Sequence, residues 1–338
     1  MADLLRVTDL EVGFKTDNGL ARVLDHVNFS IGRGEIVGLV GESGCGKTTL
    51  ARSILGVLPA NSARISSGTI DFDGRNLLEE DAATLATEIR GREITFVPQD
   101  PFSSFNPVFT IGAQIDELMK WKSPDIDPLA RRRGYSRARR RADRDRVLDL
   151  LRTVQLPDPE GILRKYPHEV SGGQRQRLMI AMALLPAPKL IIADEPTTAL
   201  DVTIQAQILK LLKRLATDLD VSVLFTTHDL GTAYEICDRV TVMYAGQEVE
   251  SAKVDEFFAR PRHPYTTRLL QSLPSQGRTI EGIPGQIPGL IDPPAGCRFH
   301  PRCAFASDTC RAARPDPEQA GPAHMVRCFH PVPVEETA

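Results

Sequence analysis

A glycine-rich segment, Gly41–Thr48, carries the most specific chemistry in this sequence. Its glycines let successive backbone N–H groups turn toward one anion, and a helix beginning at Lys47 would add partial positive charge. We expect the Lys47 ammonium to reach the β- and γ-phosphates of a nucleotide and the Thr48 hydroxyl to ligate Mg²⁺. A glycine-rich turn before a helix is the structural alternative. The residues assigned to nucleotide binding here are Gly41, Ser43, Gly44, Cys45, Gly46, Lys47, Thr48 and Thr49.

Two acidic residues, Asp194 and Glu195, follow an apolar run at 190–193 that is typical of a buried strand. Ligands of open α/β sheets bind at the carboxyl ends of strands. We expect Asp194 to hold Mg²⁺, directly or through water, and Glu195 to polarise an attacking water as general base. Two acids at a strand end are a weak signal alone, but together with the loop at Gly41 they predict a nucleotide hydrolase.

Four of the six cysteines crowd the C-terminal part of the chain: Cys297, Cys303, Cys310 and Cys328. In a reducing cytoplasm such a group indicates a metal site rather than disulfides. The spacing Cys-x5-Cys-x6-Cys-x17-Cys matches neither the common ferredoxin spacings nor the paired CxxC of zinc ribbons. The spacing alone therefore leaves open zinc, an iron–sulfur cluster or free thiols, with His300 and His324 as possible ligands if one cysteine is spare.

The elements that must position these residues alternate between short apolar runs and helical stretches. We expect strands at 7–12, 36–40, 94–97, 190–193 and 221–226, and helices at 47–55, 178–185 and 202–215. The runs are of the kind that parallel sheets bury. The pattern predicts an α/β fold with a largely parallel sheet.

The composition fits a soluble globular protein, since the 338 residues are 41% hydrophobic and 25% charged. A net charge of −3 gives no general preference for nucleic acid. No apolar run approaches the ~20 residues of a spanning helix, and the N-terminus has no signal-peptide pattern. We therefore expect a cytoplasmic chain that serves a membrane process only by docking on other subunits.

Two further segments have an unusual composition. A basic run at 131–146 is interpreted as a solvated loop and helix face, with a contact to lipid head groups or nucleic acid as the alternative. After Pro261, proline and glycine dominate, which predicts an irregular C-terminal module. Such a module has little apolar content, so we expect it to need a metal staple to fold.

The segment Ser171–Arg177 resembles the signature sequence of ABC (ATP-binding cassette) ATPases. Ser171, Gly172, Gly173 and Gln174 would open a helix and form a second anion-binding N-terminus, although an ordinary N-cap with a glycine turn has the same residues. The resemblance implies that two such domains pair head to tail. Each signature segment then closes over the ATP held by the loop of the other domain.

Other segments are similar to the remaining parts of the ABC site. Gln99 resembles the Q-loop glutamine, which senses Mg²⁺ and nucleotide, and residues 199–201, ending in Asp201, resemble the D-loop. His228 resembles the switch histidine that contacts the γ-phosphate. Phe14 falls where the family places an aromatic ring against adenine, but it could equally be a core residue. The catalytic residues implied are Lys47, Gln99, Glu195 and His228, and the Mg²⁺ ligands implied are Thr48, Gln99 and Asp194.

The resemblance implies the ABC fold, a P-loop core with a parallel sheet, an antiparallel β subdomain and an α-helical subdomain. We place the ATPase domain at 1–260, its helical subdomain at about 100–185, and a Cys-rich extension at 261–338. Within the ABC family, Gln99–Pro107 is similar to the extended Q-loop of the dipeptide/oligopeptide importers. His263–Thr267 and Gly296–Cys303 are similar to their C-terminal extension. That branch is associated with a [4Fe–4S] cluster, which implies the four cysteines as its ligands, with zinc as the alternative.

The implied function is an ATP-hydrolysing subunit that powers peptide import from the cytoplasmic face of the inner membrane. The implied partners are a second, similar ATPase chain, two transmembrane permease subunits and an extracytoplasmic peptide-binding protein, with no nucleic acid. An importer of nickel, glutathione or another small solute is the alternative, because substrate choice lies in other subunits. A soluble ABC ATPase of translation or repair would usually carry tandem domains or coiled coils, and a metal sensor with a vestigial ATPase would not need Lys47, Glu195 and His228.

Overall fold

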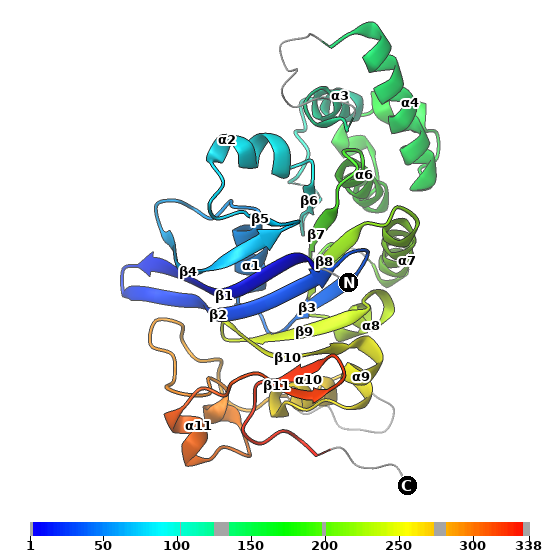
Figure 1. The fold of residues 1–338 in the computed structure, drawn as a ribbon. Coiled ribbons are helices and arrows are strands. Elements are labelled where there is room, and N and C mark those ends of the chain that lie inside the picture. Colours follow the sequence, from blue (N-terminus) through cyan, green and yellow to red (C-terminus); the bar gives the residue numbers. More distant parts are fainter. Residues whose placement is uncertain (1–2, 102, 125–134, 198–200, 274–281, 334–338) are drawn as a thin grey trace. The chain divides into compact units, whose positions relative to one another are not determined.

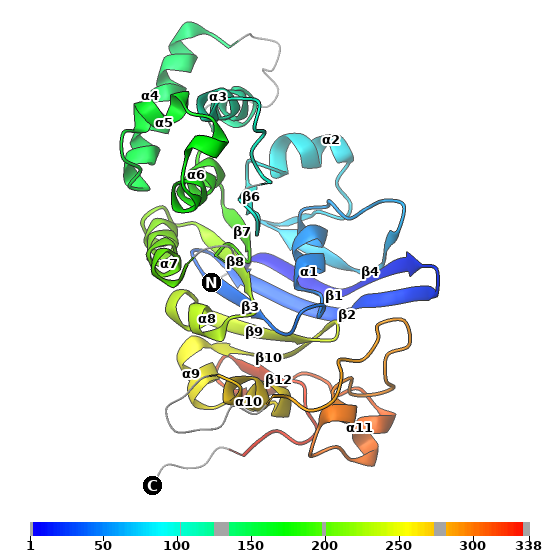
Figure 2. The same cartoon turned by 180° about the vertical axis from the view of Figure 1, so that it is seen from behind.

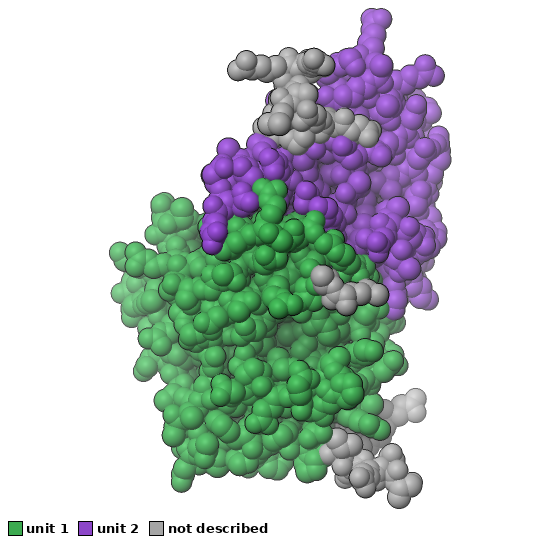
Figure 3. Space-filling view, in the orientation of Figure 1, with its two compact units in different colours: residues 1–78, 225–338 green, residues 79–224 purple. Residues whose placement is uncertain are grey.

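The computed structural model describes residues 3–101, 103–124, 135–197, 201–273 and 282–333. The chain forms two compact units, coloured in Figure 3, namely Met1–Leu78 with Phe225–Ala338, and Glu79–Leu224. Phe102, residues 131–133 of the basic run and residues 199–200 of the D-loop lie outside the described residues. Within the part of the chain that is described, no helix is both long enough and apolar enough to span a membrane.

The first unit holds an antiparallel sheet in the order β2-β1-β4-β5 and a second group of strands in the order β11-β12-β10-β9-β3 (Figure 1). Its elements are β1 (Asp3–Thr16), β2 (Gly19–Gly32), β3 (Ile36–Val40), α1 (Lys47–Ile54), β4 (Ala63–Phe72), β5 (Arg75–Asn76), α8 (Leu230–Ile236), β9 (Arg239–Tyr244), β10 (Gln247–Lys253), α9 (Val254–Ala259), α10 (Pro264–Gln271), the 3₁₀ turn η4 (His300–Arg302), α11 (Asp308–Ala312), β11 (Glu318–Gly321) and β12 (His324–Val326).

Strand β1 follows from an alternation of apolar residues. Leu5, Val7, Leu10 and Val12 are all buried, as a half-buried strand requires. The phase of this alternation changes between Val7 and Leu10, and at that point the pairing with β2 shifts register. Asp9 lies in this bulge with a φ of 51°. One extra residue in the strand therefore keeps the apolar side chains on the core side.

The second group of strands joins the start and the end of the chain. Strand β3 is buried throughout and pairs in parallel with β9, whereas β9 with β10, β10 with β12, and β12 with β11 are antiparallel. Figure 2 shows β12 beside β10. The C-terminal residues therefore extend a sheet that begins with β3, in addition to forming the irregular segment that their composition predicts.

The second unit contains a parallel strand pair, β6 with β7, and a group of helices. Its elements are α2 (Ala82–Thr84), the π turn η1 (Leu85–Ile89), β6 (Ile94–Val97), α3 (Ile111–Lys122), α4 (Arg137–Thr153), α5 (Pro159–Arg164), the 3₁₀ turn η3 (Pro167–Glu169), α6 (Gly172–Leu184), β7 (Leu190–Asp194) and α7 (Val202–Asp218). Figures 1 and 2 show α3, α4, α5 and α6 side by side. Strand β8 (Ser222–Thr227) crosses the division between the units.

Most expected elements are confirmed with small shifts of their ends. The strands at 36–40 and 94–97 have the predicted bounds, and the helix expected at 178–185 begins earlier, at Gly172, because Ser171 caps it. The largely parallel sheet is corrected to a mixed arrangement, since β10, β12 and β11 are antiparallel. The described arginines of the basic run lie on or beside α4, where all but the half-buried Arg139 are exposed.

Candidate functional site

The segment Gly41–Thr48 forms a turn between β3 and α1 that only glycines can adopt at key positions. Gly41, Gly44 and Gly46 have φ angles of 148°, 79° and 110°, which L side chains rarely adopt. A Cβ on Gly41 would lie 2.2 Å from the carbonyl oxygen of Met243. Gly44 is different, since a Cβ there would meet nothing within 4 Å. The loop is therefore constrained by packing at its start and by backbone conformation in its middle.

Lys47 folds back over this loop from the first turn of α1. Its Nζ donates to the carbonyl oxygen of Gly41 at 2.8 Å and lies 3.4 Å from that of Glu42, and the side chain is only 6% exposed. Helix α1 has no side-chain cap at its N-terminus, so its first-turn N–H groups are not used by a capping side chain. The ammonium and this helix end together make a concave, positively polarised site that suits phosphate.

The other residues predicted for this unit are placed less specifically. Cys45 is buried, and burial raises the pKa of its thiol, so it remains a neutral wall of the loop. His228 is exposed directly after β8, and the next residue, Asp229, caps α8 through Gly231. Phe14 is half-buried near the end of β1, opposite Ala21 of β2 and Ala63 of β4. Its ring is thus partly accessible rather than part of the buried core.

In the second unit, the acids predicted for catalysis stand at the end of β7. Asp194 is 7% exposed, and Glu195 follows with a φ of 47°, a left-handed conformation that is strained for a residue with a side chain. Glu195 Oε2 accepts a hydrogen bond from Nε2 of Gln99 at 3.1 Å. The structure therefore brings together the glutamine and the carboxylate that the sequence predicts as neighbours in function.

The segment predicted as the ABC signature begins helix α6. Ser171 accepts a hydrogen bond from the Gln174 backbone N–H, and the Gln174 side chain accepts one from the Ser171 N–H. This is a capping box, which fixes the direction of the helix N-terminus. Gly173 lies against Ile204 of α7, where a Cβ would be 3.1 Å from Ile204 Cγ2. Asp201 caps α7 through the Ile204 N–H at 2.9 Å.

The four C-terminal cysteines line one cavity of the first unit: Cys297, Cys303, Cys310 and Cys328. All are free thiols. Burial, together with the charge of neighbouring cysteines, raises the pKa of Cys297 to about 11 and that of Cys328 to about 12. The thiols therefore keep their protons at neutral pH unless a cation compensates their charge.

The histidines near this cavity differ from the prediction. His324 is wrong as a candidate ligand, because it is 1% exposed and its two ring nitrogens lie 2.7 Å from Glu250 and 3.4 Å from Glu256. His300 does line the cavity, and so does His330, which the sequence reasoning missed. The signal for His330 is its place two residues after Cys328, whose sulfur accepts its backbone N–H.

His263 also lines the cavity and is fully enclosed. Burial lowers the pKa of His263 to about 4, so the ring is neutral at pH 7. Its Nδ1 accepts from the backbone N–H of Tyr265 at 3.0 Å, which places the ring proton on Nε2. Among the residues that the structure describes, this buried Nε2 has no hydrogen-bond partner. The cavity wall therefore carries an unsatisfied N–H donor beside four thiols.

Family models match both parts of the chain. The ABC transporter family matches residues 24–198, more than half of the sequence. The chain belongs to the ABC transporter family. A second model, the C-terminal region of oligopeptide/dipeptide transporters, matches residues 249–310 of this ABC protein, which includes Cys297, Cys303 and Cys310.

Relatives of this ABC protein match along nearly its whole length. It is 46% identical over 330 residues to a protein of Sinorhizobium fredii named as a probable peptide ABC transporter ATP-binding protein, covering 96% of this chain and 94% of that one. It is 42% identical over 332 residues to the oligopeptide transport ATP-binding protein of Salmonella typhimurium, covering 97% and 94%. A solved ATP-binding cassette, dimeric and bound to ADP and Pi, matches with a TM-score of 0.61 and 27% identity, covering 74% of this chain and 98% of that one. The cassette fold predicted from the signature segment is confirmed.

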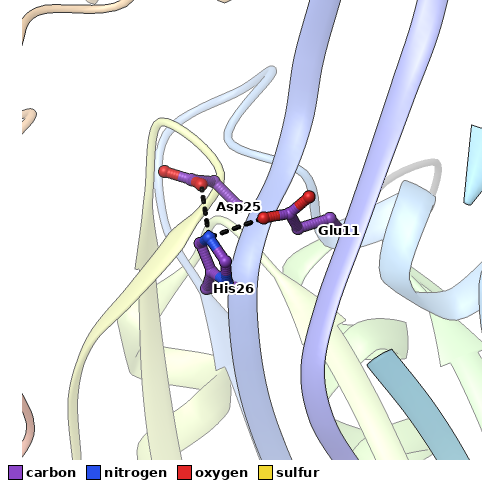
Figure 4. A group of neighbouring side chains, drawn as sticks. All are labelled: Glu11, Asp25 and His26. Atoms are coloured by element: carbon purple, nitrogen blue, oxygen red, sulfur yellow. Dashed lines mark ion pairs between the residues drawn. The ribbon is translucent and has the colours of Figure 1, made fainter. Parts of the chain in front are cut away.

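One further group of ligand-type side chains lies on β1 and β2 of this ABC protein. Figure 4 shows the His26 ring between Glu11 and Asp25, with Nε2 at 2.5 Å from Glu11 Oε1 and 4.0 Å from Asp25 Oδ1. His26 Nδ1 lies 2.6 Å from Asp9, and Asp25 is paired with Arg298 at 2.9 Å. The protein's own cationic side chains thus satisfy these acids, and we assign no ligand to the group.

Proposed function

We propose that this chain hydrolyses ATP to power the import of di- or oligopeptides through a membrane transporter. The observation that carries the proposal is the phosphate-binding loop, with Lys47 folded over three glycines, in a chain whose C-terminal part matches the oligopeptide/dipeptide transporter region. The two relatives above are named as peptide and oligopeptide transport proteins, and each aligns with nearly all of this chain. The substrate class is therefore supported by both segments of the sequence.

Nucleotide binding is assigned to the loop and its neighbours. Lys47 and the N–H groups of Gly41–Thr49 bind the β- and γ-phosphates, and Phe14 stacks on adenine. Thr48, Gln99 and Asp194 would hold Mg²⁺, which neutralises phosphate charge when it is bound. The fit of the donor set is good, because a hydroxyl, an amide and a carboxylate supply the oxygen atoms that Mg²⁺ prefers.

Hydrolysis is assigned to Glu195 and His228. Glu195 accepts the proton of the attacking water as general base, and its hydrogen bond from Gln99 orients the carboxylate. His228 contacts the γ-phosphate as charge develops on it. Ser171, Gly172, Gly173 and Gln174 present the capped N-terminus of α6 to the ATP of a second cassette, and Asp201 lies in the adjoining D-loop.

The cavity of the four cysteines supports a [4Fe–4S] cluster as its occupant. Iron would supply the positive charge that four thiols with raised pKa values need in order to ionise. Thiolates around one zinc ion lie about 3.8 Å apart at a Zn–S bond length of 2.3 Å. Among the described residues, no three ligand atoms of these cysteines and the neighbouring histidines lie within 4.8 Å of one another, which favours a larger cluster over zinc. The Nε2–H of His263 suits a sulfur acceptor.

The proposed partners follow from the importer assignment. A second, similar ATPase chain completes the two ATP sites, so that a heterodimer forms, and residues 99–107 meet two transmembrane permease subunits. An extracytoplasmic protein delivers the peptide. This places the chain on the cytoplasmic face of the inner membrane. An importer of nickel, glutathione or another small solute is the second candidate. A soluble ABC ATPase and a vestigial one are disfavoured by the match at 249–310 and by the placement of Lys47 and Glu195.

The test of the proposed function combines uptake and hydrolysis. Cells that lack this chain should lose uptake of labelled di- and tripeptides, and the wild-type chain should restore it while Lys47→Ala should not. Glu195→Gln should bind ATP normally yet lower hydrolysis by about 10²–10⁴-fold, because the general base is lost. Restored uptake of nickel or glutathione instead of peptides would change the substrate class. Wild-type turnover in Glu195→Gln would contradict the role of that carboxylate.

A further inference from the structure

An arginine of the four-cysteine segment reaches into the phosphate-binding loop. Arg302 ends the 3₁₀ turn η4, one residue before Cys303. Its Nη1 donates to Glu42 Oε2 at 2.8 Å, and its Nη2 donates to Glu42 Oε1 at 3.3 Å. The arginine side chain is only 4% exposed. This two-pronged contact between residues 260 positions apart in sequence is the geometry in which arginine binds a carboxylate most specifically.

The remaining donors of Arg302 fix its position. Nε donates to the carbonyl of Pro284 at 2.9 Å, Nη2 to that of Ile283 at 3.2 Å, and Nη1 to the hydroxyl of Tyr244 at 3.3 Å. Burial by itself would lower the pKa of Arg302, but the hydrogen bonds to Glu42 and Tyr244 raise it above its ordinary value. The guanidinium is therefore a permanent, immobilised positive charge beside the loop.

Glu42 is the second residue of the loop, between Gly41 and Ser43. Its backbone N–H donates to the hydroxyl of the buried Tyr265 at 3.1 Å, and its carbonyl lies 3.4 Å from Lys47 Nζ. The main chain of Glu42 is thus held next to the lysine that binds phosphate. A carboxylate at this position adds negative charge to a loop that must receive the negative charges of a nucleotide, so it needs a counter-charge.

The cysteine segment determines where Arg302 lies. The turn is closed by hydrogen bonds from the His300 N–H to the carbonyl of Cys297 at 3.0 Å and from the Arg302 N–H to that of Phe299 at 3.0 Å. Phe299 packs edge-on against Tyr244, with ring centroids 5.1 Å apart. Cysteines therefore flank the turn on both sides, and an aromatic contact anchors its centre.

We propose that Arg302 is a positioning residue for ATP binding, which neutralises and orients Glu42 and so couples nucleotide affinity to the folded four-cysteine segment. This inference rests on the proposed function, because the loop must bind ATP for the coupling to matter. Loss of Arg302 leaves an uncompensated carboxylate in the phosphate site and frees the start of the loop. Loss of both charges removes the repulsion, so the double variant should bind better than the arginine variant alone.

The test is a double-mutant cycle on the full-length protein, with dissociation constants for ATP, ADP and adenosine measured by calorimetry. Arg302→Gln should weaken ATP binding at least tenfold, weaken ADP binding less, and leave adenosine binding unchanged, because the repulsion acts on the phosphates. Glu42→Gln should bind ATP at least as tightly as wild type. Arg302→Gln/Glu42→Gln should return to within about threefold of wild type. In steady state the KM for ATP should rise more than kcat falls.

Arg311→Gln is the matched control, because Arg311 lies in the same segment but pairs at the surface with Asp308. It should leave all three dissociation constants unchanged. If Arg302→Gln does not fold, Arg302→Lys replaces it in the cycle, and it should show a smaller loss that Glu42→Gln again reverses. Equal affinity in Arg302→Gln and wild type, or a double variant as weak as the single one, would overturn the inference. Failure of the wild-type protein to bind ATP would instead overturn the proposed function.

Discussion

The phosphate-binding loop, Gly41–Thr48, and the four-cysteine segment, residues 296–328, belong to the same compact unit but are held in place differently. The loop depends on close neighbours in sequence, since three glycines have positive φ angles and Lys47 folds back onto the Gly41 carbonyl. The cysteine segment depends on partners far away in the sequence. These ion pairs are Arg298 with Asp25, Arg302 with Glu42, His324 with Glu250, and Arg327 with Glu248.

This difference predicts two kinds of sensitivity. A change in the loop should abolish its chemistry while the protein stays folded, because few distant contacts depend on the loop's shape. A change in the cysteine segment should first alter metal content and stability, because the segment has little apolar surface and is held by charges and thiols. Arg302 is the exception, since it belongs to the second region by sequence and acts on the first by contact.

The largest expected effect separates two glycines of the same loop. Gly41→Ala should abolish measurable ATP binding, because its Cβ would lie 2.2 Å from the backbone oxygen of Met243, which cannot move aside like a side chain. Gly44→Ala places its Cβ in open space and should cost only the left-handed backbone strain of about 1–2 kcal/mol, or roughly tenfold in affinity. Calorimetric titration with ATP measures both. Equal affinities for the two variants would contradict a packing requirement at Gly41.

The next effect tests the cysteine segment. Cys310→Ser should eliminate bound iron and its visible absorption in anaerobically purified protein, and should lower stability by about 3 kcal/mol, since a tightly bound group stabilises the folded state. Cys237→Ser is the control, because Cys237 is buried outside the segment and should leave the iron content unchanged. Full iron in Cys310→Ser, or zinc in place of iron in the wild-type protein, would contradict the proposed cluster.

The same contrast explains how much the sequence predicts. The loop, the acids after β7 and the bounds of β3 and β6 are local patterns, and the structure has them where they were expected. The mixed sheet was not predicted, because nothing local in His324–Val326 indicates that it pairs with β10. The misplaced ligand has the same origin, since His324 lies near the cysteines in sequence but contacts Glu250, which is 74 positions away.

Glu42 and Arg302 illustrate the limit most clearly. The phosphate-loop pattern leaves the position of Glu42 unspecified, and Arg302 lies between two cysteines that dominate the interpretation of that motif. Their pairing depends on a tertiary contact that no periodicity or spacing encodes. The two residues become visible only when the turn η4 is placed beside the loop.

The smallest expected effect concerns pH and the buried pair of His324 and Glu250. Burial alone would lower the pKa of His324, but hydrogen bonds and charge from Glu250 and Glu256 raise it above 6.5. Glu250 also accepts the backbone N–H groups of Arg262 and His263, so it is held in place without the histidine. A raised pKa in the folded state means that protonated His324 stabilises the fold below pH 6.5, and that this contribution disappears as pH rises through the folded-state pKa.

His324→Gln keeps a hydrogen-bond donor but removes the charge, and should lower the free energy of unfolding at pH 6 by about 1–3 kcal/mol. The difference from wild type should shrink steadily toward pH 9, where the wild-type imidazole is neutral as well. Urea unfolding followed by circular dichroism across this range measures it. A difference that stays constant with pH would show that the pair acts through packing alone. The cysteine segment would then be joined to β10 without the charge that sets it apart from the phosphate-binding loop.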